Sequence, residues 1–185
     1  DAITTGSENV CVGMGAGGGI NTGTRNTCIG DDAGNTITTG TRNIAIGHLV
    51  MANTSVTGTG NICIGYQSGI TIAAGSNNIF IGENCGDGAN STDSIGMGHD
   101  ALSGDTGNNC VAIGVEALQL NSGTNNTGVG NHAGQLITSG SSNTIIGAYD
   151  GNEDSIDGRT DSNRIYISDG DGNILLYGDN NSQAF

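Results

Sequence analysis

The 185-residue sequence contains no proline, no tryptophan and no lysine, and aromatic residues make up only 3% of it. With so few rings, a core has to be built from Ile, Val, Leu, Ala and Thr, which predicts a thin, layered core. Proline lacks a backbone N–H group and is avoided inside β-sheets. Its absence therefore fits a chain in which most N–H groups join a hydrogen-bonded ladder.

Positive charge is also scarce. The sequence has four arginines and 18 acidic residues, so the net charge at pH 7 is −14. Such a chain repels phosphate groups, and neither nucleic acid nor an anionic membrane surface is an expected partner.

Long apolar runs are missing as well. A membrane-spanning helix needs about 18 apolar residues in succession, and no such stretch exists. No segment resembles a signal peptide either. Because the sequence begins at Asp1 without a methionine, we expect it to be a segment of a longer protein, with any targeting or anchoring signal outside it.

The five cysteines are an odd number and form no Cys-x-x-Cys pair, so neither a zinc site nor a closed disulfide framework is indicated. Cys11 and Cys28 fall at equivalent repeat positions, at a separation compatible with a disulfide if the repeats stack. Their side chains would point the same way, so packed free thiols are the preferred interpretation.

What the sequence has in abundance is a repeat. Its kernel is Asn-x-x-Ile/Val-Gly, preceded by Gly-Thr/Ser and followed by a small-residue turn. The kernel glycines, at positions 13, 30, 47, 65, 82, 98, 114, 130 and 147, are separated by 16 to 18 residues. Two degenerate copies have Ser94 and Cys110 in place of the asparagine. The clearest structural positions are Asn26, Gly30, Asn43, Gly47, Asn61, Gly65, Asn78, Gly82, Asn143 and Gly147.

We therefore predict an all-β fold, a parallel β-roll or β-solenoid of about nine repeats over residues 1–149. One repeat cannot bury its own apolar residues, so successive repeats must stack. A weaker apolar run between kernels, such as Ala33 to Ile37, predicts a second short strand in each repeat. Gly and Asn at the turns tolerate positive φ angles.

Side chains alternate along a strand, so the residues flanking the middle of each kernel share one face. That face is apolar in nearly every copy, as in Ile44/Ile46 and Ile62/Ile64. The middle residue points the opposite way and is small or apolar, as in Cys11, Ala45 and Phe80. Two apolar faces imply a partner surface, and we expect the Cys11/Ala45/Phe80 face to meet another copy of the chain.

Residues 150–185 depart from the pattern. An acidic stretch, residues 150–161, precedes two alternating runs, residues 165–168 and 173–177, that flank a Gly/Asp turn. These predict a β-hairpin. We expect an acidic linker followed by a hairpin that caps the roll or begins the next module.

The kernels resemble those of known fibrous proteins. Asn43–Gly47 and Cys110–Gly114 resemble the repeats of trimeric autotransporter adhesin heads, and the turn Thr38–Thr41 is similar to repeat regions of phage tail fibres. The longer period here and the cysteines, which persist in a reducing cytoplasm, favour the phage fibre. The resemblance implies an intertwined or side-by-side homotrimer in a virion tail fibre. Such a fibre joins other fibre or tail domains and attaches to a host-cell glycan or protein. The alternative is an adhesin head on a bacterial surface.

Few residues are candidates for chemistry. Asp169, Asp171 and Asn173 alternate as in the start of a calcium loop, but Ile174 and Asn180 depart from that motif, so a plain hairpin turn is preferred. His48, His99 and His132 are interpreted as surface or turn residues. Tyr66 and Tyr149 follow kernel glycines and are candidate receptor contacts, for which a structural role is the main alternative.

No catalytic residues or cofactors are predicted, and we expect a structural and attachment module in place of an enzyme. A glycan-cleaving groove between chains would not be visible in one sequence. An ice-binding solenoid is a further alternative, since threonines recur at one turn position, at Thr24, Thr41, Thr59 and Thr124. This row is broken because Arg25 and Arg42 intervene and because Ser76 and Ser141 replace threonine.

Overall fold

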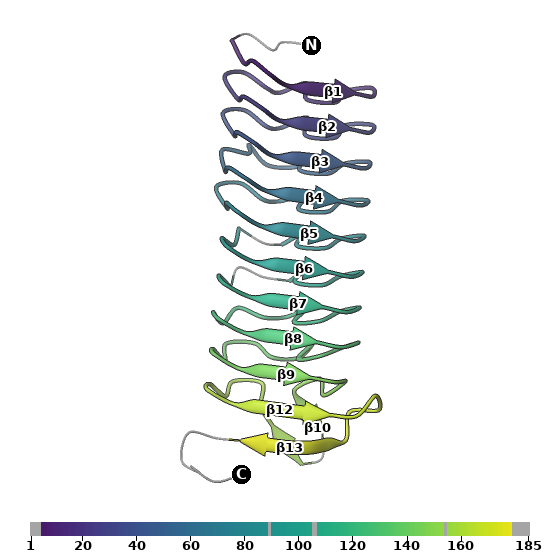
Figure 1. The fold of residues 1–185 in the computed structure, drawn as a ribbon, viewed down its shortest axis with the longest axis vertical. Coiled ribbons are helices and arrows are strands. Elements are labelled where there is room, and N and C mark those ends of the chain that lie inside the picture. Colours follow the sequence, from purple (N-terminus) through teal and green to yellow (C-terminus); the bar gives the residue numbers. More distant parts are fainter. Residues whose placement is uncertain (1–4, 89, 105–106, 154, 179–185) are drawn as a thin grey trace.

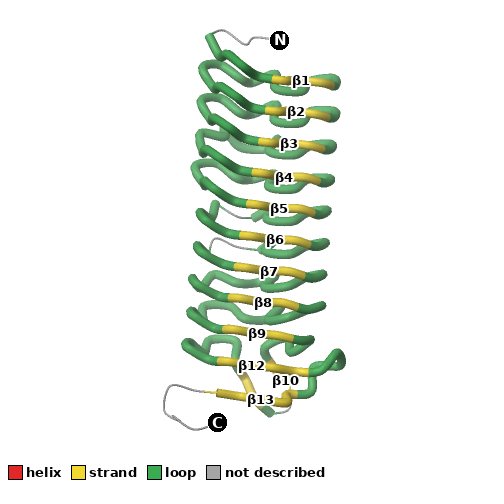
Figure 2. The backbone as a smooth tube through the Cα atoms, in the orientation of Figure 1, coloured by secondary structure: helices red, strands yellow, loops and turns green. Residues whose placement is uncertain are grey.

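The computed structural model describes residues 5–88, 90–104, 107–153 and 155–178. Within these ranges the chain is a tall column of stacked rungs, made of short strands and turns and without a helix (Figures 1 and 2). The strands of the column are β1 (Val10–Val12), β2 (Thr27–Ile29), β3 (Ile44–Ile46), β4 (Ile62–Ile64), β5 (Ile79–Ile81), β6 (Ile95–Met97), β7 (Val111–Ile113), β8 (Thr127–Val129) and β9 (Thr144–Ile146). Beyond them lie β10 (Asn152–Glu153), β11 (Ile156–Asp157), β12 (Ile165–Ser168) and β13 (Ile174–Gly178).

Each kernel forms one strand, and each strand pairs in parallel with the next. The register is without shifts, so that Cys28 lies beside Ala45 and Ala45 beside Cys63. The large sheet runs β1 to β9 in sequence order and continues into β12 and β13. The prediction of an all-β parallel solenoid of about nine repeats is confirmed.

The core lies inside the column, in stacks that run along its axis. One stack consists of the middle residue of each strand, a second of the residue three after most kernel glycines, and a third of the residue seven after several of those glycines. Their fully buried members include Cys28, Ala45, Cys63 and Phe80 from the first stack, Ala33, Val50 and Ala117 from the second, and Ile20, Ile37 and Ile72 from the third.

The interior is narrow, and neighbouring rungs compensate in size. Phe80 pairs with Gly96 on the next strand, where a methyl group would lie only 3.2 Å from the Phe80 ring and 2.7 Å from Cys85 Sγ. A large ring therefore fits because the rung beside it has no side chain.

The expected orientation of the kernel faces is wrong. The middle residues point into the chain's own core, and the flanking Ile and Val residues point outward. In β3, for example, Ala45 is fully buried while Ile44 and Ile46 are half-buried. The Cys11/Ala45/Phe80 face is thus covered by the same chain, and the face left for a partner is the opposite one.

The second strand expected in each repeat is largely absent from the described residues. The return segments form turns, with isolated parallel bridges such as Ile37 to Val56 and Thr41 to Thr59. Neighbouring segments still exchange backbone hydrogen bonds, such as Gly34 N to Val50 O at 2.8 Å. The short, Gly-rich return path turns too often to keep an extended run.

The predicted C-terminal hairpin is confirmed. β12 pairs in parallel with β9, as a tenth rung, and antiparallel with β13. The small antiparallel pair of β10 and β11 lies beside it. The first rung and the hairpin are at opposite ends of the column (Figure 1).

Candidate functional site

The outer face of the sheet is an exposed apolar strip, which we call the apolar ladder. It consists of the first and third residues of each strand from β1 to β9, together with Ile165 and Ile167 of β12. Its members are Val10, Val12, Thr27, Ile29, Ile44, Ile46, Ile62, Ile64, Ile79, Ile81, Ile95, Met97, Val111, Ile113, Thr127, Val129, Thr144, Ile146, Ile165 and Ile167. None of them is charged.

Solvent reaches this ladder along its whole length. Val12 is 57% exposed, Met97 41%, Ile113 40% and Ile146 45%. With strands about 4.8 Å apart, nine steps from β1 to β12 give a face about 43 Å long and on the order of 400 Å² in area. The largest exposed apolar patch on a typical soluble monomer has about this area, roughly 300 to 600 Å², and is often functional.

The kernel asparagines hold the rungs in register, and those from Asn26 onward are buried. The Asn26 side-chain oxygen accepts the backbone N–H of Asn43 at 2.9 Å, and its amide donates to Gly40 O at 2.9 Å. Asn43 repeats both contacts with Asn61 and Gly58. The buried turn carbonyls and N–H groups therefore find partners at every such rung.

This asparagine ladder is interrupted at the two degenerate kernels. Ser94 Oγ accepts the backbone N–H of Cys110 at 3.2 Å, from a side chain that is shorter than that of asparagine. At Cys110 the gap is filled by Asn121, which lies in the turn and accepts a hydrogen bond from the Asn126 amide at 2.7 Å. Asn121 is almost fully buried. Its role was missed from sequence because it lies outside the kernel.

Turns bordering the ladder carry the histidines. His48 and Tyr66 follow the kernel glycines of β3 and β4, and their ring centroids lie 5.5 Å apart. Tyr66 is 42% exposed, so its predicted position on the surface is correct. Receptor contact by Tyr66 stays a prediction.

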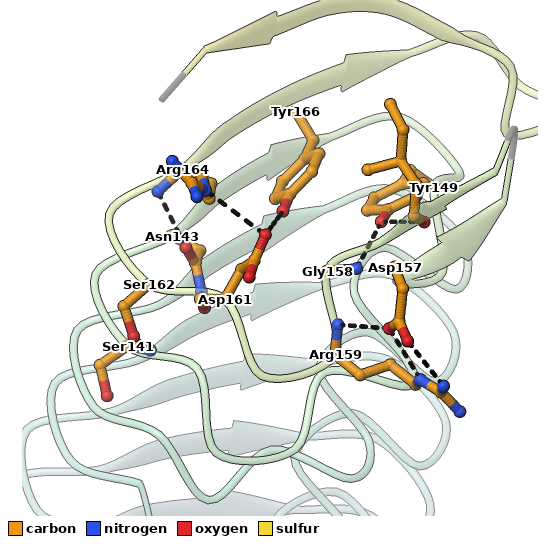
Figure 3. Close-up of polar contacts among 11 residues, drawn as sticks. Ser141, Asn143, Tyr149, Asp157, Gly158, Arg159, Asp161, Ser162, Arg164 and Tyr166 are labelled. Atoms are coloured by element: carbon orange, nitrogen blue, oxygen red, sulfur yellow. Dashed lines mark hydrogen bonds and ion pairs between the residues drawn. The ribbon is translucent and has the colours of Figure 1, made fainter. Parts of the chain in front are cut away.

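Tyr149, the other predicted receptor contact, is not on the surface. It is fully buried and stacks on Tyr166 with 4.6 Å between ring centroids. Its hydroxyl donates to Ile156 O at 3.0 Å and accepts Gly158 N at 3.1 Å (Figure 3). Burial raises the pKa of both tyrosines above the usual range. Tyr149 closes the end of the core, where the kernel pattern stops.

The predicted calcium-loop residues form a compact turn. Asp169 Oδ1 accepts the backbone N–H groups of Asp171 and Asn173, each at 3.0 Å, and Oδ2 accepts the Asn173 amide at 2.9 Å. The hydrogen bond from Asn173 lowers the pKa of Asp169 below its usual value. This is what a plain hairpin turn requires. The calcium hypothesis stays a prediction, and its last position, Asn180, lies outside the described residues.

The histidines differ in their surroundings. His48 Nε2 lies 3.5 Å from one carboxylate, that of Asp31. His99 Nδ1 lies 3.5 Å from Asp100, and His132 Nε2 lies 3.7 Å from Glu116. His99, Asp100 and Glu116 offer three ligand atoms within 4.8 Å of one another.

Among the threonines considered for ice binding, Thr41 and Thr59 stack, with their hydroxyls 3.2 Å apart. The next positions after Thr59 and Thr124 are occupied by Ser76 and Ser141, whose hydroxyls accept the backbone N–H groups of those threonines, each at 3.0 Å. The row of threonines is therefore interrupted by serines.

All five cysteines are free thiols. Cys11 and Cys28 are paired in register on β1 and β2, as the repeat predicted. Burial raises the pKa of Cys28 and Cys85 to about 12. These thiols stay protonated at neutral pH and act as small apolar core residues.

In comparisons with known proteins, no family model matches the chain, and neither a curated protein nor a solved structure matches it significantly. The described part of the chain also contains no helix that is long and apolar enough to cross a bilayer.

Proposed function

We propose that the chain is a structural and host-attachment segment of a trimeric viral tail fibre, in which three copies pack side by side along their apolar ladders. The continuous, uncharged apolar ladder is the observation that carries this proposal. Covering such a face stabilises the assembly by roughly 25 cal/mol per Å² of apolar surface removed from water. The rest of the column is strongly acidic, with a net charge of −14 per chain.

The shape of the column supports a spacer role. Its rungs stack in one direction, so length grows with repeat number and not with core size. Each rung is also closed by its own chain, with the middle strand residues buried inside it. Copies of such a column fit together side by side, without the intertwining that an open rung would require.

The fibre assignment itself rests on the kernel resemblance to phage tail fibres, with a bacterial adhesin head as the alternative. Tyr66, exposed beside the ladder, is the candidate contact to a host-cell glycan. Neighbouring fibre or tail domains are the other partners that such a segment would have.

The test is the molar mass of the chain in solution, measured by light scattering with and without reductant. We expect a trimer in both conditions. Ile113→Glu places a carboxylate on the ladder and should shift the mass to that of a monomer. Leu120→Glu is the matched control, because Leu120 is 46% exposed, against 40% for Ile113, but is not part of the ladder. A stable wild-type monomer would rule out the trimer.

A further inference from the structure

We propose that His99, Asp100 and Glu116 form a binding site for a divalent transition-metal ion of the zinc class, which cross-links two rungs of the column. Among the described residues, this is the one group of three histidine, cysteine or carboxylate side chains whose ligand atoms lie within 4.8 Å of one another. One imidazole and two carboxylates match the nitrogen and oxygen ligands of Zn²⁺. Calcium would require six or more oxygens.

The backbone fixes the three residues relative to one another. His99 and Asp100 follow the kernel glycine of β6, and Glu116 occupies the matching turn after β7. Glu116 N donates to His99 O at 2.8 Å, which locks the two turns together one rung apart. Asp100 and Glu116 share a left-handed backbone, with φ of 55° at both, so their side chains leave the column at equivalent points.

Neighbouring side chains orient the ligands. His132 Nε2 lies 3.7 Å from Glu116 Oε2, and the same oxygen accepts a hydrogen bond from the Gln135 amide. The Gln135 amide is held in turn by Gln119 at 3.0 Å. In a tetrahedral zinc site with bonds of about 2.0 Å, ligand atoms lie roughly 3.3 Å apart. The His99–Asp100 distance of 3.5 Å is already close to that value.

Electrostatics favours a cation at this point. Asp100 and Glu116 lie on adjacent rungs, and the ligand atoms of both carboxylates lie within 4.8 Å of each other and of the His99 ligand nitrogen. A divalent ion would be attracted by both carboxylates. His99 is half-exposed, so an ion can enter from solvent.

The location gives the site a structural purpose. β6 and β7 belong to the two kernels whose asparagine is replaced, by Ser94 and Cys110. Between these two rungs the side-chain hydrogen bond comes from the Ser94 hydroxyl, which accepts the backbone N–H of Cys110, and not from an asparagine amide. An ion bound by His99, Asp100 and Glu116 would join the same two rungs from the outside, where the internal asparagine ladder is interrupted.

Calorimetric titration of the full chain with ZnCl₂, in the presence of a non-chelating reductant, tests the site. We expect one Zn²⁺ per chain and a higher midpoint of thermal unfolding. Asp100→Asn and Glu116→Gln, both near-isosteric surface changes, should weaken binding at least about tenfold, as ligand-sphere changes do. Circular dichroism without metal confirms that these variants are folded.

His48→Asn is the matched control. His48 holds the same turn position as His99 but lies beside a single carboxylate, Asp31, so its loss should leave zinc affinity unchanged. Cobalt substitution should give a spectrum without thiolate charge-transfer bands, which excludes the cysteines as ligands. Absence of saturable zinc binding, equal weakening by His48→Asn, or cobalt–thiolate bands would each overturn the proposal.

Discussion

At the residue scale, the kernel asparagine has a role that its polarity alone does not suggest. Asn43 is fully buried, yet its oxygen accepts from both the backbone N and the side-chain amide of Asn61, at 2.9 and 3.1 Å. Its own amide donates to Gly58 O at 2.9 Å. Removing the side chain would leave buried donors and an acceptor without partners.

We expect Asn43→Ala to lower the free energy of unfolding by about 2 to 4 kcal/mol, because a buried group left unsatisfied costs about 1 to 3 kcal/mol. Urea unfolding followed by circular dichroism measures the change. Asn53→Ala is the control, since Asn53 is exposed and should shift stability by no more than about 0.5 kcal/mol. Equal effects of the two variants would contradict the role given to the asparagine ladder.

At the element scale, the glycine that ends each strand sets how closely rungs approach. Gly65 has φ of 129°, and a methyl group there would lie 2.5 Å from Gly82 O on the next rung. Both the backbone conformation and the contact exclude a side chain.

Gly65→Ala should therefore destabilise the column by at least about 2 kcal/mol, since a strained backbone residue alone costs about 1 to 3 kcal/mol. Gly170→Ala in the hairpin turn is the matched control, because a methyl group at Gly170 meets nothing within 4 Å. Thermal and urea unfolding of the pair measures the difference. If Gly65→Ala were as stable as Gly170→Ala, the close stacking of the kernel glycines would be disproved.

The strands were predictable from sequence, but their orientation was not. The period of the kernels fixed the strands and their parallel register, because a repeat can stack only on its own kind. The large Ile residues suggested an inner face, whereas the narrow interior accepts Cys28, Ala45 and Gly96 and leaves Ile outside. The size match of Phe80 with Gly96 at one register position was the signal that could have shown the direction.

Candidate site residues were located correctly from sequence where the kernel pattern holds and incorrectly where it ends. Tyr66 was placed correctly on the surface because its turn repeats the kernel pattern. Tyr149 was misplaced because the pattern ends there, and its ring closes the core against Tyr166. The cluster of His99, Asp100 and Glu116 joins two repeats. Asp100 and Glu116 each lie two residues after a kernel glycine, so the repeat period was a signal that could have placed them side by side.

At the scale of the whole molecule, charge and apolar area oppose each other. Each chain carries a net charge of −14, so a trimer brings three strongly negative columns together. The apolar ladder contains no charged residue. Attraction between copies would therefore come from apolar burial, and repulsion from carboxylates elsewhere on the columns.

This balance predicts that salt strengthens self-association. Between about 0.01 and 1 M NaCl the screening length falls from about 30 to about 3 Å, which weakens repulsion between chains and leaves apolar contacts in place. Sedimentation equilibrium with EDTA present, so that metal binding plays no part, should show a dissociation constant that falls several-fold across this range. Leu120→Glu, which leaves the ladder intact, should show nearly the same salt dependence as the wild type. A trimer that dissociates as salt rises would mean that ion pairs hold the copies together, and the apolar ladder would then have to face a different partner.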